Sequence, residues 1–137
     1  AKAKAEDVEA YVTYTISEVT SGITSIHHQQ AETFENIFAA VEDLNTKISI
    51  AYNNCHMLYW VSPDSLVRVK GLEGFQLLDS ISTLIFTDKV IYQKMLRFKS
   101  SDGYKTLKAN RKILADNMIQ NFERTGVNLN EPHAAFD

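Results

Sequence analysis

One apolar seam runs through the first 58 residues and constrains the fold more than any other feature. Steps of four and three residues from position 12 reach fourteen positions, of which eleven are plainly apolar and a twelfth is cysteine. These positions are Val12, Ile16, Val19, Ile23, Ile26, Gln30, Thr33, Ile37, Val41, Leu44, Ile48, Ala51, Cys55 and Leu58. A 3.5-residue spacing held this long is typical of helices packed in a bundle or coiled coil. The sequence therefore predicts an all-α fold, an elongated helical bundle with a long N-terminal helix or helix pair.

Residues 51–60, AYNNCHMLYW, hold the only cysteine and the only tryptophan of the chain, together with a histidine. Cys55 lies on the seam, where it acts as a small apolar residue. His56 is the next residue, and it points about 100° further round a helix. A cysteine and a histidine that diverge in this way do not readily bind one metal ion. We therefore interpret Cys55 as a core residue and expect no thiol or metal site here.

The seam is polar at one place, where Gln30 and Thr33 occupy seam positions beside the run His27 to Gln30. One interpretation is a continuous helix over residues 5–60, which would be about 80 Å long at 1.5 Å per residue. The alternative is two helices with a break at this run. We favour the continuous helix, because no proline interrupts it. Alternating β-branched and aromatic residues leave a strand over residues 10–19 as a further alternative.

Residues that favour the start of a helix follow Trp60. Ser62, Pro63 and Asp64 offer a capping residue, a proline at the first helical position and an acid in the first turn, so a helix is expected to start there. The alternative is a small hairpin near residues 59–70, which would make the fold α+β. Residues 74–86 are apolar on most of their surface and are predicted to be the most buried element.

Two further helices are predicted before the end of the chain. Residues 88–99 and 104–124 are expected to be helical, separated by a turn over residues 100–103 and closed by Gly126. The inward side chains are expected to be Ile91, Met95, Phe98, Leu107, Leu114 and Met118. We predict a single helical domain over residues 1–126 and an extended C-terminal tail over residues 127–137.

Charge is distributed unevenly along the chain. Residues 1–66 carry three Lys and nine Asp or Glu, a net charge of -6, and residues 67–137 carry eleven Lys or Arg and eight acids, a net charge of +3. Residues 89–112 hold eight basic groups against Asp102 alone. We expect this segment to present an interaction face made of Lys94, Arg97, Lys99, Lys105, Lys108, Arg111 and Lys112. The competing interpretations are a solvated helix face and a face that pairs with the acidic half of the same chain.

Motifs of catalysis and cofactor binding are missing from the sequence. It has no glycine-rich phosphate loop, no G-x-S-x-G elbow, no H-E-x-x-H zinc motif and no Glu-x-x-His pair of the di-iron bundles. We therefore expect no enzyme, no cofactor and no bound metal. The single cysteine cannot form an intrachain disulfide, which slightly favours a cytoplasmic location. No apolar run reaches the length of a membrane span.

Three classes of function remain. The favoured one is a non-enzymatic helical interaction or assembly protein that self-associates through acidic and basic faces, as a structural subunit of a filament, particle or complex. The partner would then be a second copy or another protein. The first alternative is a ligand-sensing helical bundle domain of a receptor, with a candidate polar seam site at His27, Gln30 and Thr33. The second is binding of nucleic acid or an anionic surface through residues 89–112, which the pI of about 5.8 does not favour.

Overall fold

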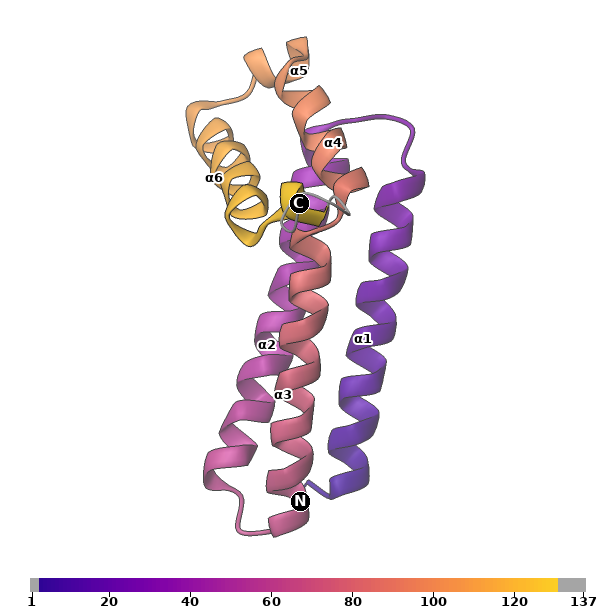
Figure 1. Cartoon of the computed structure of the whole chain (residues 1–137), viewed down its shortest axis with the longest axis vertical. Helices are drawn as coiled ribbons and strands as arrows, with labels where there is room; N and C mark the ends of the chain where they lie inside the picture. The colour runs from indigo at the N-terminus through magenta and orange to yellow at the C-terminus, as the bar shows by residue number, and fades with distance from the viewer. Residues whose placement is uncertain (1–2, 131–137) are drawn as a thin grey trace, which may run out of the picture. The chain divides into compact units, whose positions relative to one another are not determined.

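The computed structural model describes residues 3–130, and these residues form helices and connections without a strand (Figure 1). The element order is α1 (Ala5–His28), the π-helix η1 (Phe34–Ala39), α2 (Ala40–Val61), α3 (Ser65–Phe86), α4 (Lys89–Lys99), α5 (Asp102–Lys105), α6 (Ala109–Thr125) and the 3₁₀ helix η2 (Val127–Asn130). The predicted all-α helical bundle is confirmed. The strand over residues 10–19 and the hairpin near residues 59–70 are wrong, because α1, α2 and α3 cover those residues.

The chain divides into two compact units, and α1, α2 and α3 each run from one unit into the other. Unit 1 comprises residues 1–22 and 43–82, and unit 2 comprises residues 23–42 and 83–137. The single domain expected for residues 1–126 therefore stays a prediction.

Unit 1 is built from the parts of α1, α2 and α3 that lie side by side with alternating direction in Figure 1. The seam supplies its core, where Val12, Leu44, Ile48 and Cys55 are all at most 4% exposed. Helices α2 and α3 approach closely at Gly71: a Cβ there would lie 2.7 Å from the carbonyl oxygen of Cys55. These seam side chains are buried as their spacing predicts, and Cys55 is completely buried.

Unit 2 is built around α4, which contacts η1, α5, α6 and η2. The predicted inward residues Ile91, Met95 and Phe98 of α4 are buried. Asp88 caps this helix: its carboxylate accepts a hydrogen bond of 2.9 Å from the Ile91 amide. Helix α6 ends at Gly126, whose φ of 99° lies in the left-handed region that glycine adopts without strain, as the sequence predicted.

The continuous helix favoured for residues 5–60 is wrong, and the two-helix alternative is observed. Helix α1 ends at His28, and a non-helical connection runs to residue 33. Thr33 is extended, and its hydroxyl accepts a hydrogen bond of 3.0 Å from the Asn36 amide at the start of η1. The helix is interrupted at the polar seam residues, where the Thr33 side chain satisfies a free backbone amide at the start of η1.

Several local predictions need correction. The helix after the SPD sequence begins at Ser65, and Asp64 caps it by accepting from the Leu66 and Val67 amides. Residues 74–86 are not the most buried element, since Leu77 and Leu84 are 53% and 61% exposed. Leu114, which was expected to point inward, is 54% exposed. Residues 102–105 form the short helix α5 in place of a turn, and residues 127–130 form a 3₁₀ helix in place of an extended tail. The rest of that predicted tail, residues 131–137, lies outside the described residues.

Candidate interaction surfaces

The basic segment of residues 89–112 is largely engaged within unit 2. Lys94 is only 7% exposed, and its ammonium donates to the Gln29 carbonyl at 2.8 Å and lies 3.8 Å from the Glu32 carboxylate. Arg97 donates to both oxygens of Glu32, with a shortest distance of 2.6 Å. Lys94 therefore does not belong to an exposed face, which corrects the predicted set. The sequence could not show this, because the connection after α1 had been assigned to a continuous helix.

Another basic residue, Arg111, contacts the start of η1. Arg111 donates to Glu35 at 2.6 Å, and its guanidinium lies 4.9 Å from the centroid of the Phe34 ring. The acidic first half and the basic second half therefore meet within one chain at these residues. Because Arg97 donates to Glu32, the pKa of this carboxyl is held below its usual value of 4.5.

The remaining predicted cations surround Tyr104 or lie at the surface. Lys99 pairs with Asp116 at 3.3 Å, and Asp116 also accepts a hydrogen bond from Tyr104. That hydrogen bond raises the pKa of Tyr104. Lys112 lies 5.6 Å from the centroid of the Tyr104 ring. Lys105 is 74% exposed with Asp102 at 3.8 Å, and Lys108 is exposed at the start of α6.

The candidate polar seam site does not assemble. His27 lies 2.7 Å from the Asp88 carboxylate, so it holds the capping residue of α4. Thr33 caps η1, and Gln30 is exposed in the connection. The three residues therefore form no common site, and His27 and Thr33 each stabilise the start of a helix.

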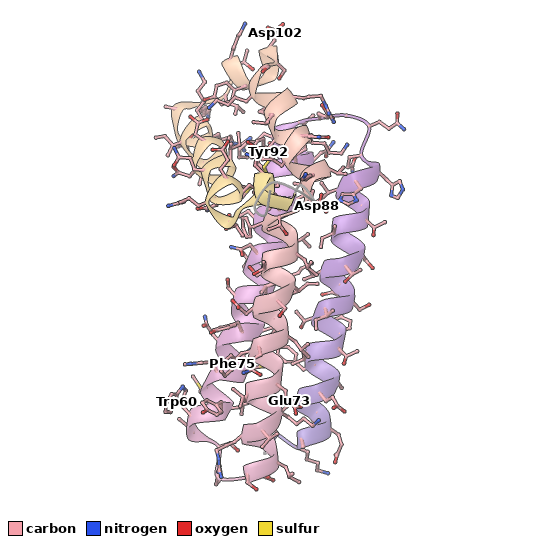
Figure 2. All side chains as sticks on the ribbon, in the orientation of Figure 1. Trp60, Glu73, Phe75, Asp88, Tyr92 and Asp102 are labelled. Atoms are coloured by element: carbon pink, nitrogen blue, oxygen red, sulfur yellow. The ribbon has the colours of Figure 1, made fainter. Side chains whose placement is uncertain are left out.

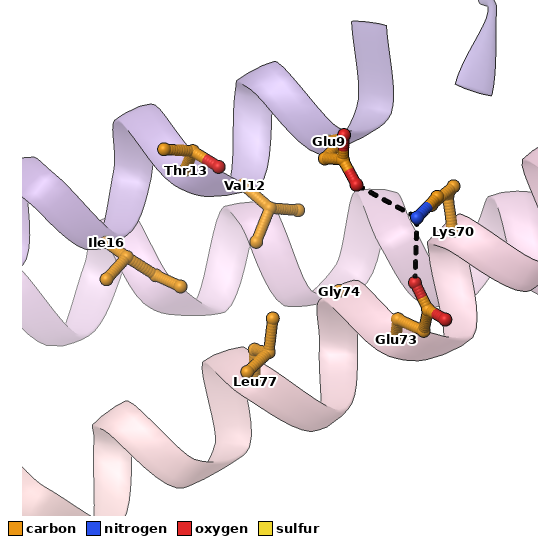
Figure 3. Close-up of a pocket in the computed structure, with 8 residues that line it drawn as sticks. All are labelled: Glu9, Val12, Thr13, Ile16, Lys70, Glu73, Gly74 and Leu77. Carbon is orange, nitrogen blue, oxygen red and sulfur yellow. Dashed lines mark hydrogen bonds and ion pairs between the residues drawn. The ribbon is translucent and has the colours of Figure 1, made fainter. Parts of the chain in front are cut away.

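A small depression in unit 1 offers another candidate for a ligand (Figure 3). Val12, Ile16 and Leu77 line it, and Lys70 bridges Glu9 at 2.9 Å and Glu73 at 3.2 Å beside it. Its volume is about 80 Å³, whereas sites for small molecules usually measure about 300–1,000 Å³. This depression is too small to support the ligand-sensing alternative.

The largest feature that the sequence analysis missed is an apolar stripe on the outward face of α2. We call it the outer stripe, and it consists of Thr46, Ile50, Asn53, Met57 and Trp60. Its members follow one another at steps of four, three, four and three residues, and all are exposed. Ile50, Met57 and Trp60 are 55%, 62% and 68% exposed. The same helix buries Ile48, Ala51 and Cys55 on its opposite side.

Apolar exposure continues past the end of α2. Val61 is 67% exposed, and Leu66 and Val69 at the start of α3 are 66% and 48% exposed. A hollow of about 280 Å³ lies at this turn and is lined in part by Leu58, Pro63 and Val67. Large apolar surfaces that continue in this way mark contact sites in soluble proteins.

Trp60 is held in place by neighbouring aromatic residues although most of its surface is exposed. Its indole nitrogen donates to Nε2 of His56 at 3.1 Å, and its ring lies 5.3 Å from the ring of Tyr59. His56 and Tyr59 both pack against Phe75 of α3, at 5.1 and 5.7 Å between ring centroids. Figure 2 shows Trp60 and Phe75 near the same end of unit 1. The tryptophan is therefore an exposed side chain with aromatic neighbours on one side.

Four of the five outer-stripe residues, Ile50, Asn53, Met57 and Trp60, lie in a segment without formal charge, and Thr46 precedes it beside Lys47. No Asp, Glu, Lys or Arg occurs from Ile48 to Pro63, a run of sixteen residues. This run, combined with a second 3.5-residue spacing on the helix face opposite the seam, is the signal that could have revealed the stripe.

Within the described residues, no helix is long and apolar enough to cross a membrane, and no group of three or more His, Cys, Asp or Glu is arranged to hold a metal ion. No protein-family model, curated protein or solved structure matches the chain.

Proposed function

We propose that the chain is a non-enzymatic helical interaction and assembly protein, a subunit that self-associates or joins a protein complex. The contact surface is the uncharged outer stripe with the apolar turn between α2 and α3. The acidic and basic faces expected from the sequence are not needed for this contact.

The observation that carries the proposal is the exposure of Met57, Trp60, Val61 and Leu66, each above 60%. Interfaces are enriched in Trp, Tyr and Met at their centres and depleted of charged residues. Tryptophan is also among the residues that contribute most to binding free energy. Trp60 also contacts Tyr59 and donates a hydrogen bond to His56, and such contacts reduce the entropy that a side chain loses on binding.

Contacts within unit 2 favour the uncharged surface over association through charges. Glu32 and Glu35, two acids of the acidic first half of the chain, already bind Arg97 and Arg111 of their own chain. A contact with a second copy would have to replace these ion pairs with equivalent ones. The gain would be small, since exposed ion pairs contribute about 0–1 kcal/mol.

Sedimentation across a salt series tests the proposal. We expect an oligomer that persists as salt rises from about 0.1 to 1 M, because apolar contacts are not screened. Met57→Lys should shift the protein towards monomer, because it places a charge in the contact. Ser17→Lys, an exposed substitution on α1, is the matched control and should change nothing.

Two results would argue against this function. Self-association is refuted if the protein stays monomeric at all concentrations up to about 1 mM. Only contacts weaker than about -4 kcal/mol are left undetected at that concentration. An oligomer that dissociates with rising salt and is unaffected by Met57→Lys would restore the interpretation based on charged faces.

A further inference from the structure

We infer that a hollow between α2 and α3 in unit 1 binds a small organic cation, a molecule with an ammonium group and a short apolar part. All residues that line the hollow belong to unit 1, and its volume is about 240 Å³. Binding here is independent of the proposed function, because Asn53 is the one residue that the hollow shares with the outer stripe.

Buried apolar side chains line one part of the hollow. Ile48 of α2 and Leu78 of α3 are 4% and 0% exposed. Every other lining residue is polar and more exposed, and these residues include Asn45, Asn53 and Ser82. Apolar linings with a few polar groups that fix orientation are typical of sites for small molecules. A ligand that fits this lining therefore combines an apolar part with a hydrogen-bonding part.

The volume restricts the ligand to a few heavy atoms. Sites for drug-sized molecules usually measure about 300–1,000 Å³. A water molecule takes up about 30 Å³ in the liquid, so the 240 Å³ of this hollow corresponds to roughly eight waters. This space is three times that of the depression beside Lys70. It is enough for a short alkyl chain that ends in one polar group.

Charge selects a cation over an anion. Asp79 is the one formally charged residue of the lining, and it is also the only one from residue 74 to residue 86 of α3. On α2, residues 48–61 carry no formal charge. Unit 1 as a whole has eight Asp or Glu and five Lys or Arg, a net charge of -3. A negative potential of this kind attracts cations and disfavours anionic ligands.

The polar lining matches an ammonium group, which has three N–H donors and no acceptor. The carboxylate of Asp79, the amide oxygen of Asn53 and the hydroxyl of Ser82 are acceptors. Asp79 also interacts within the chain, but a carboxylate has about four acceptor sites. Tyr52 adds an aromatic ring, packed against Phe75 at 5.3 Å between centroids, and such rings attract cations. Acceptors and an aromatic ring are thus available to one ammonium group.

A metal ion fits the hollow less well than an organic cation. Calcium takes about six to eight oxygen ligands, commonly with carboxylates among them. This lining has one carboxylate, and no group of three or more His, Cys, Asp or Glu in the described part of the chain is arranged to hold a metal. A metal ion would also leave Ile48 and Leu78 uncovered, whereas the apolar part of an organic cation packs against them.

Titration with two matched ligands, followed in amide NMR spectra of the full chain, tests the inference. n-Butylamine is protonated at neutral pH and supplies an ammonium group, whereas n-butanol has the same alkyl chain without the charge. Butylamine should shift the side-chain amide signals of Asn45 and Asn53. It should bind about tenfold or more tightly than butanol, because hydrogen bonds to charged groups are the stronger ones.

Substitutions in the lining test the named residues. Asp79→Asn keeps the size of the side chain and should raise the dissociation constant of butylamine by about tenfold or more. Ser49→Trp, at an exposed position of the lining, should fill the hollow and abolish the shifts. Asp43→Asn removes an exposed acid elsewhere on α2, and as the matched control it should leave binding unchanged. Thermal unfolding shows whether each variant is folded.

Several results would overturn the inference. They are no response to butylamine at concentrations up to about 0.1 M, equal binding of butylamine and butanol, and unchanged binding by folded Asp79→Asn. A Ca²⁺ titration that shifts the same amide signals at lower concentration than butylamine would assign the hollow to a metal ion instead. Sedimentation of the wild type decides the proposed function separately, so either proposal can fail alone.

Discussion

Cys55 shows how one residue can look reactive in the sequence and be inert in the fold. Its side chain is fully buried, and burial raises the pKa of its thiol. A Cβ added to Gly74 would lie 2.9 Å from its sulfur, so the packing around it is close. The thiol therefore serves as a small apolar group in the core of unit 1.

Replacing Cys55 by Ala should lower the free energy of unfolding by roughly 1 kcal/mol, as expected for a small buried truncation. Urea denaturation measures this change. In the native wild type, a bulky thiol reagent should react at the rate of global or local unfolding. Rapid labelling of the folded protein would contradict the buried position.

Glu32 predicts a dependence of stability on pH. Because Arg97 lowers the pKa of this carboxyl in the folded state, its ionised form stabilises the fold fully above the usual value of 4.5. The contribution is lost as the pH falls through the lower folded value. Glu32→Gln should therefore be less stable than wild type near neutral pH, and the difference should shrink in acid.

Chemical denaturation of both proteins at about pH 7 and about pH 3 would measure this difference. Arg97→Gln should reduce the same pH dependence, because it removes the partner. An equal difference between wild type and Glu32→Gln at both pH values would show that the ion pair does not act in solution.

At the scale of elements, the sequence predicted the packing faces better than the helix ends. The seam positions of α1 and α2 and the inward residues of α4 were assigned correctly, because burial imposes a period that the sequence must follow. The break after His28 was the alternative and not the favoured interpretation, because neither proline nor glycine marks it. The break is stabilised by the Thr33 cap and by the contacts that Lys94 and Arg97 make with the connection. The contacts of Lys94 and Arg97 join residues 65 positions apart in the sequence.

Hydrophobicity alone misled the assignment of α3 and α6. Leu77, Leu84 and Leu114 are more than half exposed although their segments are apolar. The amount of apolar surface in a helix does not say how many neighbours cover it.

The close approach of α2 and α3 gives a prediction at this scale. Gly71→Ala should destabilise the protein by about 1–3 kcal/mol, because the new Cβ meets backbone atoms of α2, which cannot rotate away. Gly22→Ala is the matched control, since its Cβ meets only the flexible end of Leu44. Thermal unfolding should show the larger loss for Gly71→Ala. Equal losses would mean that α2 and α3 can separate freely.

For the whole molecule, the charge difference between the two halves contributes to folding within one chain. Glu32 and Glu35 bind cations more than sixty residues away in the sequence. The candidate interaction face stays a prediction, and its members Lys94, Arg97 and Arg111 contact residues of their own chain. The remaining exposed cations are left for solubility or for weak electrostatic attraction.

Reversing Lys105, Lys108 and Lys112 to Glu together should leave the oligomer intact in sedimentation experiments, because the outer stripe is more than forty positions away in the sequence and carries no charge. The variant should also stay folded, since exposed charge changes cost little stability. Dissociation of the folded triple variant would point back to the basic face. Binding of a nucleic acid by wild type that the triple variant loses would support the second alternative instead.

The division into two units has a consequence for the order in which the chain is made. Every residue of unit 1 precedes position 83, whereas most of unit 2 follows it. During synthesis, the three helices of unit 1 are therefore available for packing before α4 and α6 exist. Until those helices arrive with Lys94, Arg97 and Arg111, Glu32 of the connection and Glu35 of η1 have none of the cations that bind them in the finished protein.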